Sequence, residues 1–574
     1  MYDHLIQFFK HQDYTHRRKI ILVVGFTLIG AVLEMLGLGL FLPIMNYLVT
    51  DQIPQVMSNQ LGVLTRLSKE EISAYVIGLL CVFFILKNTI LTFMTYHTHR
   101  LIGDLRFDVS KRLFEGYINR EYSNFILHNS STIIKNLTTM ISNLNTYVLI
   151  QGGIFLTECF VLIGLMTLSL FLMPLQSCLL FGFIFIPSYI YFSLTKKRIA
   201  RYGAESNNNE ASRINCVHNM IGSIRDIQLL NKRKFFIDRH DQSTGSVTQN
   251  AFKVTFMTQS TKYVLESILI FSITTLVLFQ LAQGPSMLGL IPVLGFYAIA
   301  GFRIIPCINR LIVAVQSLKF GEDILKTIND DLTVNPTTKN IKPQQILSFS
   351  KHIHITDLCF TYRGQASQVL KNINMKIKKG EAIGVCGETG SGKSTLLNIL
   401  LGFLKPSSGT VTIDGFDIHQ EHVNLSQVLG FVPQDIFLLD DSIANNIAFG
   451  IPPDLIDQTR LEWAIREAGL GSLIKKAKHG LDTSVGERGI QISGGQRQRI
   501  GIARAFYFGA KILIFDEATS ALDEKTERLI MQNIRRLIGR YTLFIVAHRL
   551  STLSLCDRVY QLKDARTRAF KLKQ

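Results

Sequence analysis

Nine consecutive residues have the types and spacing needed to hold a phosphate chain: Gly387, Glu388, Thr389, Gly390, Ser391, Gly392, Lys393, Ser394 and Thr395. They fit the phosphate-loop pattern G-x-x-x-x-G-K-[ST] without a mismatch. Glycines let backbone N–H groups point at an anion, and the N-terminus of a following helix favours negative charge. In this pattern Lys393 reaches the β- and γ-phosphates and the Ser394 hydroxyl binds Mg²⁺. The stretch therefore predicts a site for ATP and Mg²⁺.

Two adjacent carboxylates supply the groups that hydrolysis of a bound ATP requires. The apolar run Ile512 to Phe515 is typical of a strand, and Asp516 and Glu517 follow it directly. We expect Asp516 to hold Mg²⁺ through water and Glu517 to be the general base that polarises the attacking water. A strand that ends in two acids means little by itself, so this interpretation depends on the phosphate loop.

A second candidate anion site consists of Ser493, Gly494, Gly495 and Gln496, which precede a helix-forming run from Arg497 to Ala505. A serine and two glycines at the start of a helix favour an anion. Two anion sites in one domain suggest that the second serves a nucleotide bound by another copy of the chain. The alternative, a glycine turn that only caps the helix, stays open.

The phosphate loop must lie between a strand and a helix, and its flanks fit that order. Ala382 to Val385 is an apolar run before the loop, and Leu396 to Leu400 is an apolar run after it. Beyond residue 351 the chain has short β-rich runs, glycine turns and amphipathic helices, which indicates an α/β fold. We predict an α/β P-loop ATPase domain over residues 351–574, preceded by a polar linker over residues 321–350.

The composition is too apolar for an ordinary soluble enzyme, because 47% of the 574 residues are hydrophobic and the mean hydropathy is +0.24. The net charge of +18 suits nucleic acid, but many basic residues lie in loops beside apolar runs, as in membrane proteins. We therefore predict no nucleic-acid partner. The eight cysteines are scattered without a C-x-x-C pair, so we expect neither a disulfide framework nor a zinc site.

Residues 1–320 predict a helical membrane domain with six spans, because a span needs about 20 apolar residues. The apolar stretches are Lys19–Leu48, Ile72–Tyr96, Val148–Leu172, Leu175–Leu194, Tyr263–Leu281 and Met287–Leu318. Two long loops are rich in basic residues, which predicts that these loops and the N-terminus lie in the cytoplasm. In these loops His99–Ile118 and Asn207–Leu230 have helical periodicity, so we expect helices that extend beyond the bilayer. On the other side we expect a short amphipathic helix over Val56–Leu67.

Together these motifs resemble the ATP-binding cassette (ABC) exporters that fuse six spans to one nucleotide-binding domain. The resemblance covers almost the whole chain and adds three positions: Tyr362 would stack on adenine, Gln434 would sense Mg²⁺ and the attacking water, and His548 would contact the γ-phosphate. Asp523 would be the last residue of the loop that follows the carboxylates Asp516 and Glu517. The signature before Ser493 usually opens with Leu, and here the position is Ile492. That change keeps volume and polarity, so we expect a competent ATPase.

The resemblance also implies how copies of the chain assemble. The chain has one cassette, so a homodimer with two equivalent composite sites is the simplest assembly. Coupling helices would fall near Arg120–Phe125 and near Asp226–Phe235, and Val485–Gly489 would contact the transmembrane half. We expect an integral protein of the bacterial inner membrane with the nucleotide-binding domain in the cytoplasm. ATP binding and hydrolysis would drive alternating access.

The cargo must be inferred from charges inside the predicted spans. Lys87 and Arg303 lie at similar depth, roughly two-thirds of the way to the inner side at about 1.5 Å per residue. Basic groups there suit the phosphate or pyrophosphate headgroup of a membrane lipid or a lipid-linked glycan. Alternatively they pair with Glu266 or Glu158, or extend to the interface. Both interpretations stay open.

A finer resemblance bears on the cargo. Residues from Phe296 to Arg310, with Glu34 and Pro43, are similar to bacterial lipid-linked oligosaccharide flippases. They favour a polyprenyl-pyrophosphate-linked oligosaccharide as substrate. The alternatives are an exporter of peptides, drugs or other lipids, an importer on the same scaffold, or a nucleotide-gated or regulatory protein without hydrolysis. Glu517 and His548 argue against the last.

Overall fold

The computed structural model describes residues 2–10, 14–50, 69–126, 129–172, 174–282, 287–334, 345–362, 364–365, 367–420, 423–517, 524–547 and 549–570. By its contacts the chain divides into two compact units. Unit 1 comprises Met1–Arg120 and Phe125–Thr337, and unit 2 comprises Glu121–Asn124 and Thr338–Gln574.

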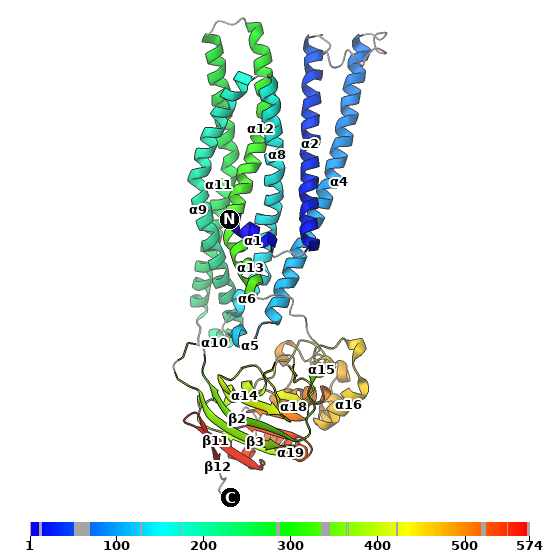
Figure 1. Ribbon diagram of the computed structural model, residues 1–574, viewed down its shortest axis with the longest axis vertical. Coiled ribbons are helices and arrows are strands. Elements are labelled where there is room, and N and C mark those ends of the chain that lie inside the picture. The colour runs from blue at the N-terminus through cyan, green and yellow to red at the C-terminus, as the bar shows by residue number, and fades with distance from the viewer. Residues whose placement is uncertain are drawn as a thin grey trace. The chain divides into compact units, whose positions relative to one another are not determined.

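Unit 1 is built of helices (Figure 1). Its helices are α1 (Tyr2–Lys10), α2 (Tyr14–Thr50), α4 (Lys69–Ile118), α6 (Ser130–Leu137), α7 (Thr139–Asn143), the π-helix η2 (Leu144–Leu149), α8 (Ile150–Leu172), α9 (Pro174–Gly222), α10 (Ile224–Leu229), α11 (Arg233–Ala282), α12 (Met287–Phe320) and α13 (Glu322–Val334). The 50 residues of α4 extend about 75 Å, more than twice the roughly 30 Å of a bilayer core. The prediction that the long basic loops are helices extending beyond the bilayer is therefore confirmed.

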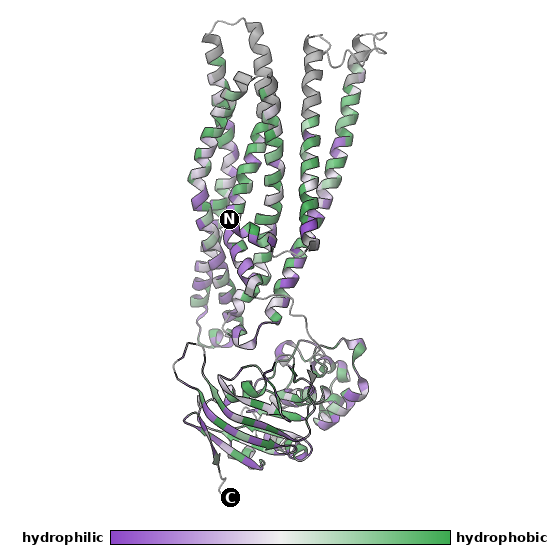
Figure 2. Cartoon of the chain, in the orientation of Figure 1, coloured by the Kyte–Doolittle hydropathy of each residue, from purple (hydrophilic) through white to green (hydrophobic). Residues whose placement is uncertain are grey.

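Five of the six predicted spans fall within a single helix, and Val148–Leu172 begins in η2 and continues through α8. Apolar residues gather along the middle of α2, α4 and α8 (Figure 2). By length and hydropathy, three stretches among the described residues suffice to cross a membrane: Arg17–Leu36, Ile77–Ile118 and Ser130–Thr167. Ile304–Phe320 and Glu322–Thr333, which meet at 46°, make a fourth if they count as one bent span. The predicted helix over Val56–Leu67 lies outside the described residues.

The stretch predicted as a polar linker is helical in its first half. Glu322–Val334 forms α13, in which Ile324, Leu325 and Ile328 are buried. Their spacing of one, three and four residues places them on one helix face, so the segment packs although its composition is polar. The linker prediction was wrong for these residues, while Pro336 and Pro343 lie outside the described part of the chain.

A cluster of polar side chains holds α4, α6 and α13 together within unit 1. Arg120 Nη2 lies 2.9 Å from Asp331 Oδ1. Asn136 Nδ2 donates to Asp331 Oδ2 at 3.0 Å and to the Tyr117 hydroxyl at 2.9 Å. Hydrogen bonds to a charged carboxylate contribute more than neutral ones, so Asp331 fixes the register of the three helices.

Short helices occur at both positions where coupling helices were expected. The first is α5 (Tyr122–Phe125), whose residues up to Asn124 group with unit 2. The Tyr122 ring lies 4.9 Å from the ring of Phe403, another residue of unit 2. The second is α10 (Ile224–Leu229), where the following Leu230 is exposed. A helix at each position is confirmed, and the docking of α10 stays a prediction.

Unit 2 combines a mostly parallel sheet with helices and a second, antiparallel sheet. The six-stranded sheet has the order β12-β11-β4-β10-β9-β8, and the four-stranded sheet has the order β3-β2-β5-β6. The strands are β1 (Gln345–Ile346), β2 (His352–Phe360), β3 (Leu370–Lys378), β4 (Ala382–Cys386), β5 (Ser408–Ile413), β6 (Phe416–Asp417), β7 (Val423–Asn424), β8 (Leu429–Val432), β9 (Ile512–Asp516), β10 (Thr542–Val546), β11 (Arg558–Lys563) and β12 (Arg566–Phe570).

Helices cover the parallel sheet, whose central strands are buried and apolar. The helices are α14 (Lys393–Leu400), α15 (Ile443–Ile447), α16 (Gln458–Glu467), α17 (Gly471–Lys476), α18 (Gly494–Tyr507), α19 (Glu524–Leu537) and α20 (Leu550–Leu553), with 3₁₀ turns η3 (Pro453–Leu455), η4 (Gly480–Asp482) and η5 (Glu487–Gly489). Every residue of β10 is buried, as parallel strands covered on both faces require. The prediction of a helical membrane domain joined to an α/β P-loop domain is confirmed.

Candidate functional site

The parallel strands bring the predicted site residues to one edge of the sheet. Strand β10 pairs in parallel with β4 on one side and β9 on the other, and Val546 is level with both Val385 and Asp516. Adjacent strands lie about 4.8 Å apart, so Asp516 and Val385, two residues before the phosphate loop, are about 10 Å apart. The loop after β4 and the carboxylates after β9 therefore open into the same space.

The phosphate loop has the predicted strand–loop–helix form, between β4 and α14. Gly390 and Gly392 have φ of 83° and 102°, left-handed values that a residue with a Cβ adopts only with strain. Lys393 is buried, and its Nζ donates to the carbonyls of Gly387 and Glu388 at 2.9 Å each. The loop thus wraps around its own ammonium group and places that charge where a phosphate would sit.

The candidate adenine-stacking residue lies beside the loop. Tyr362 follows β2, and its hydroxyl is 3.0 Å from Thr395 Oγ1 on the first turn of α14. Its ring meets the Phe360 ring edge-on at 4.9 Å, and 39% of its surface remains exposed. Tyr362 is therefore partly exposed beside the phosphate loop, and stacking on adenine stays a prediction.

Asp516 and Glu517 have the environment of a cation site. Burial raises the pKa of Asp516 above its ordinary value, the neighbouring Glu517 charge raises it further, and Lys393 lowers it in part. Glu517 has a φ of 47°, and its N–H donates to the Val546 carbonyl at 2.9 Å. A left-handed conformation at a residue with a Cβ costs energy and is often found at active sites. The backbone thus turns sharply at the predicted general base.

The oxygens gathered here fit Mg²⁺. Mg²⁺ prefers oxygen ligands and is usually held by one or two protein groups together with substrate phosphates. Asp516 supplies a carboxylate, and Ser394 supplies an exposed hydroxyl on the first turn of α14. Among the described residues no three His, Cys, Asp or Glu side chains form a metal cage of their own. The residues therefore suit a cation that arrives with a nucleotide.

Ser493 begins α18, and its side chain is used in a helix cap. Ser493 Oγ accepts from the Gln496 N–H at 3.4 Å, and Gln496 Oε1 accepts from the Ser493 N–H at 2.9 Å. This reciprocal pair is a capping box, which satisfies backbone donors at the helix start. The capping interpretation is confirmed, and an additional anion-binding role for Ser493, Gly494, Gly495 and Gln496 stays a prediction.

Two neighbours of α18 complete this part of the site. The carbonyl of Gln434, which follows β8, accepts from Gln498 Nε2 at 3.3 Å, so the loop after β8 is attached to α18. Ile492, the departure from the usual signature, is 8% exposed and lies in the main apolar core of unit 2. An isoleucine there keeps the packing, as the sequence predicted.

Some predicted site residues lie beyond what the structure describes. His548 and Asp523 are outside the described residues, and Arg303 lies in α12 but its side chain is not described. Lys87 on α4 is 4% exposed, and its Nζ lies 4.8 Å from the centre of the Phe84 ring. The proposed proximity of Lys87 and Arg303 therefore stays a prediction.

The structure identifies a charge pair that sequence reasoning missed. Glu158 on α8 is bound by Arg310 on α12, with Arg310 Nη2 at 3.2 Å from Glu158 Oε2. Glu266 instead lies 3.8 Å from Lys262, one helical turn away. An arginine and a glutamate in separate predicted spans were the available signal, but nothing local in the sequence indicates which helices pack together.

Two family models match this chain. The model described as "ABC transporter" matches residues 370–520, and the model described as "ABC transporter transmembrane region" matches residues 20–284. Together they cover most of the membrane unit and the centre of the P-loop unit.

Curated relatives and a solved structure add to these matches. "Leukotoxin translocation ATP-binding protein LktB" of Mannheimia glucosida is 33% identical over 384 residues, which are 65% of this chain and 53% of the relative. The protein of the same name from Mannheimia haemolytica gives the same identity and coverage. The chain thus spans about half the length of the curated relatives it matches. The "Structure of a bacterial Atm1-family ABC exporter with ATP bound" shares the fold, with a TM-score of 0.74, 20% identity and coverage of 97% of this chain and 95% of that one.

Proposed function

The chain belongs to the ABC transporter family, and from this premise we propose that it hydrolyses ATP to drive export across a membrane. One observation carries the proposal: the strand order brings Lys393, Asp516 and Glu517 to the same edge of one parallel sheet. An ammonium group and two carboxylates at that edge can bind the phosphates, hold the cation and activate water.

Each residue has a role in the proposed hydrolysis. The backbone N–H groups of Gly390 to Ser394 and the Lys393 ammonium bind the phosphates, while Tyr362 holds the adenine. Bound Mg²⁺ neutralises charge that develops on the transferred phosphoryl group. Glu517 accepts a proton from the attacking water. His548 and Gln434 orient the phosphate and the water.

We further propose that the working form is a homodimer. The chain contains one phosphate loop and one Ser493–Gln496 segment. A helix start with backbone N–H groups directed outward is a good partner for the γ-phosphate of a nucleotide held by another chain. Two chains facing each other would form two equivalent sites, each with Lys393 from one chain and Ser493 from its partner.

A polyprenyl-pyrophosphate-linked oligosaccharide is the first candidate cargo. Lys87 is almost completely buried on α4, within the predicted second span. A buried cation in a span is costly and marks a functional position by default. Together with Arg303 it would provide positive charge for a pyrophosphate headgroup drawn from the inner leaflet.

A peptide or protein is the second candidate cargo. It is favoured by the curated relatives, whose printed name assigns them to leukotoxin translocation. The shared segment is about half of their length, so the part that recognises their cargo need not be shared. The same ATPase scaffold serves either candidate.

Reconstitution in liposomes separates the two candidates. The purified chain is supplied with ATP and either a labelled polyprenyl-pyrophosphate oligosaccharide or a labelled unfolded peptide. The first candidate requires ATP-dependent movement of the glycolipid, whereas movement of the peptide alone would overturn it in favour of the second. If neither cargo moves and ATP is not hydrolysed, the proposal that the chain is an ATP-driven exporter is wrong.

Variants of the span cations sharpen this experiment. Lys87→Met and Arg303→Ala should reduce glycolipid movement while hydrolysis without cargo persists, because neither residue belongs to the ATP site. Lys111→Met, which changes an exposed lysine on the same helix as Lys87, is the matched control. A fall in melting temperature with no separate effect on transport would favour a structural role for these cations.

A further inference from the structure

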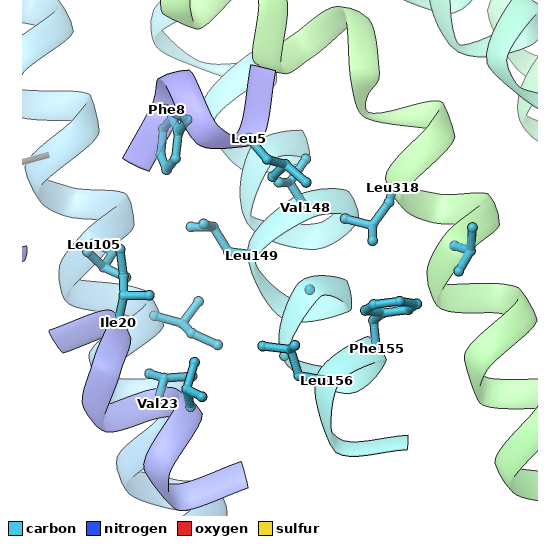
Figure 3. Close-up of a pocket in the computed structure, with 15 residues that line it drawn as sticks. Leu5, Phe8, Ile20, Val23, Leu105, Val148, Leu149, Phe155, Leu156 and Leu318 are labelled. Carbon is cyan, nitrogen blue, oxygen red and sulfur yellow. The ribbon is translucent and has the colours of Figure 1, made fainter. Parts of the chain in front are cut away.

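Unit 1 contains an apolar cavity beneath its N-terminal helix (Figure 3). Its volume is about 260 Å³. Six helices contribute apolar side chains to its wall: Leu5 and Phe8 from α1, Val23 from α2, Leu105 from α4, Leu149 from η2, Leu156 from α8 and Leu318 from α12. Figure 3 shows these side chains directed toward a common space from opposite sides.

The lining selects a hydrocarbon occupant. A buried water needs two to four polar partners, and a smaller apolar cavity of about 150 Å³ is known to stay dry and to bind benzene. This cavity is larger, and the side chains that line it are aliphatic or aromatic. Transfer of each methylene group from water into such a space is favourable. An unbranched alkyl chain suits the space better than a polar ligand does.

Cationic residues surround the place where α1 and α2 meet. Arg17 lies one helical turn before Ile20, which lines the cavity, and Arg17 Nη2 donates to the Lys10 carbonyl at 2.8 Å. The side chains of Lys10, Arg17 and Arg18 are exposed. Asp104 and Asp108 lie 3.6 and 3.4 Å from the Nζ of Lys19 and offset its charge. Among the described residues, the side chains of Lys10, Arg17 and Arg18 thus place exposed basic groups at this junction.

Helix α1 is held over the cavity by contacts and not by its own stability. It has nine residues, too few for a stable isolated helix. Phe8 is 3% exposed, and Asn329 Nδ2 of α13 donates to the His4 carbonyl at 2.8 Å. The apolar face of α1 thus forms a wall of the cavity while its C-terminal Lys10 stays at the junction with α2.

We propose that this cavity binds one acyl chain of an anionic phospholipid from the cytoplasmic leaflet, with the headgroup held by Lys10, Arg17 and Arg18. The junction lies at the start of the first span, on the side that the basic loops assign to the cytoplasm. Each lysine or arginine near an anionic leaflet adds to the electrostatic attraction between the protein and that leaflet. The proposal uses the membrane orientation of the proposed function but is independent of the cargo.

Two glycines make the proposal testable without damage to the fold. Gly152 and Gly153 on α8 line the cavity, and a Cβ built on either meets no atom within 4 Å. Gly152→Leu would therefore extend a side chain into free space and would also replace a poor helix former with a good one. Gly25→Leu is the matched control, because Gly25 on α2 is equally open but does not line the cavity.

The measurement is native mass spectrometry of the delipidated full chain with added dioleoyl phosphatidylglycerol or dioleoyl phosphatidylcholine. We expect one phosphatidylglycerol per chain, bound at least about tenfold more tightly than phosphatidylcholine, a difference of about 1.4 kcal/mol. Gly152→Leu should lose this lipid at least tenfold while its melting temperature without lipid does not fall, and Gly25→Leu should retain it. Equal lipid binding by the two leucine variants, or no bound lipid in the unaltered chain, would overturn the proposal.

Two further arms separate the acyl chain from the headgroup. Arg17→Gln with Arg18→Gln should abolish the preference for phosphatidylglycerol and leave weaker binding of both lipids. Glycerol 3-phosphate, which has the anionic group without the acyl chains, should not displace the bound lipid. Displacement by glycerol 3-phosphate, or an unchanged preference in the double variant, would contradict the proposed pair of contacts. ATP hydrolysis measured on the same samples reports separately on the proposed function.

Discussion

At the scale of single residues, the site depends on charges that the backbone places before any ligand arrives. Lys393 is held by two carbonyls of its own loop, and Asp516 carries a raised pKa because it is buried beside Glu517. Glu517 has a left-handed φ that its side chain does not favour. Opposite charges that are prepared in this way need little rearrangement to bind a nucleotide and its cation.

The first prediction concerns the general base. Glu517→Gln should lower steady-state ATP hydrolysis about 100-fold or more, because an amide cannot accept the proton of the attacking water. Binding of ATP with Mg²⁺, measured by equilibrium dialysis, should persist, because Lys393 and Asp516 are unchanged. The control is Glu462→Gln, which removes an exposed carboxylate of α16. Hydrolysis that survives in the Glu517 variant would show that another group is the base.

The second prediction concerns the pH dependence of stability. Asp414 accepts from the Ser350 N–H at 2.5 Å, from the N–H groups of Lys351 and His352 at 2.8 Å each, and from the Ser350 hydroxyl at 2.9 Å. Burial alone would raise the pKa of Asp414, but these hydrogen bonds outweigh burial and hold the pKa below its ordinary value. Its carboxylate therefore stabilises the fold above the ordinary Asp pKa, and this contribution is lost as the pH falls through the lowered value.

Asp414→Asn should accordingly cost about 1 kcal/mol at neutral pH, after allowance for solvent screening. Asparagine tolerates the φ of 50° at this position, so the backbone should not change. We expect the melting temperature of the full chain to fall by a few degrees at pH 7 and the difference to shrink in acid. Asp454→Asn, at an exposed turn, is the control. A difference that grows as the pH falls would contradict the account.

At the scale of helices and strands, local sequence patterns predicted many individual elements but not which helices pack against each other. The flanks of the phosphate loop, the strand before Asp516 and the helix after Ser493 were all predicted from local sequence and are confirmed. Helix α13 was missed because its polar composition concealed apolar residues three and four apart. The contact of Glu158 with Arg310 joins residues 152 positions apart, which no local pattern encodes.

The third prediction tests this contact between α8 and α12. Glu158 has 9% of its side chain exposed, whereas Arg310 has 48% exposed. Arg310→Met would leave a buried carboxylate without its partner, at a cost of about 3–5 kcal/mol. Glu158→Gln should cost less, because the arginine can extend toward the interface. The double variant should be more stable than Arg310→Met alone.

Melting curves of the purified full chain in one detergent provide the measurement. We expect the highest melting temperatures for the unaltered chain and the double variant. Glu158→Gln should melt at a lower temperature, and Arg310→Met at the lowest. Lys262→Met, which removes an exposed partner of Glu266 within α11, controls for the loss of a surface charge. Equal losses in both single variants, with no recovery in the double variant, would show that the two charges do not act as a pair.

At the scale of the whole molecule, the sequence predicted both parts of the chain and how many ATP-site components each chain carries. Apolar runs longer than a soluble core needs indicated the membrane helices, and the ordered motifs indicated the cassette. The same sequence does not reveal the cargo, because the role of Lys87 and Arg303 depends on which residues of other helices surround them. One phosphate loop and one Ser493 segment per chain lead to the central claim that two chains build each ATP site.

Mixed dimers test this claim most directly. Chains with Lys393→Ala and chains with Ser493→Arg are given different affinity tags, coexpressed, and purified in two steps so that only mixed dimers remain. In such a dimer both defects fall in one composite site, and the other site keeps an intact Lys393 and an intact Ser493. The account predicts ATP hydrolysis at least about tenfold above that of either parent homodimer, a difference of at least about 1.4 kcal/mol in barrier. Hydrolysis no higher than in the parents would contradict it, because a site built within one chain would be damaged in every chain present.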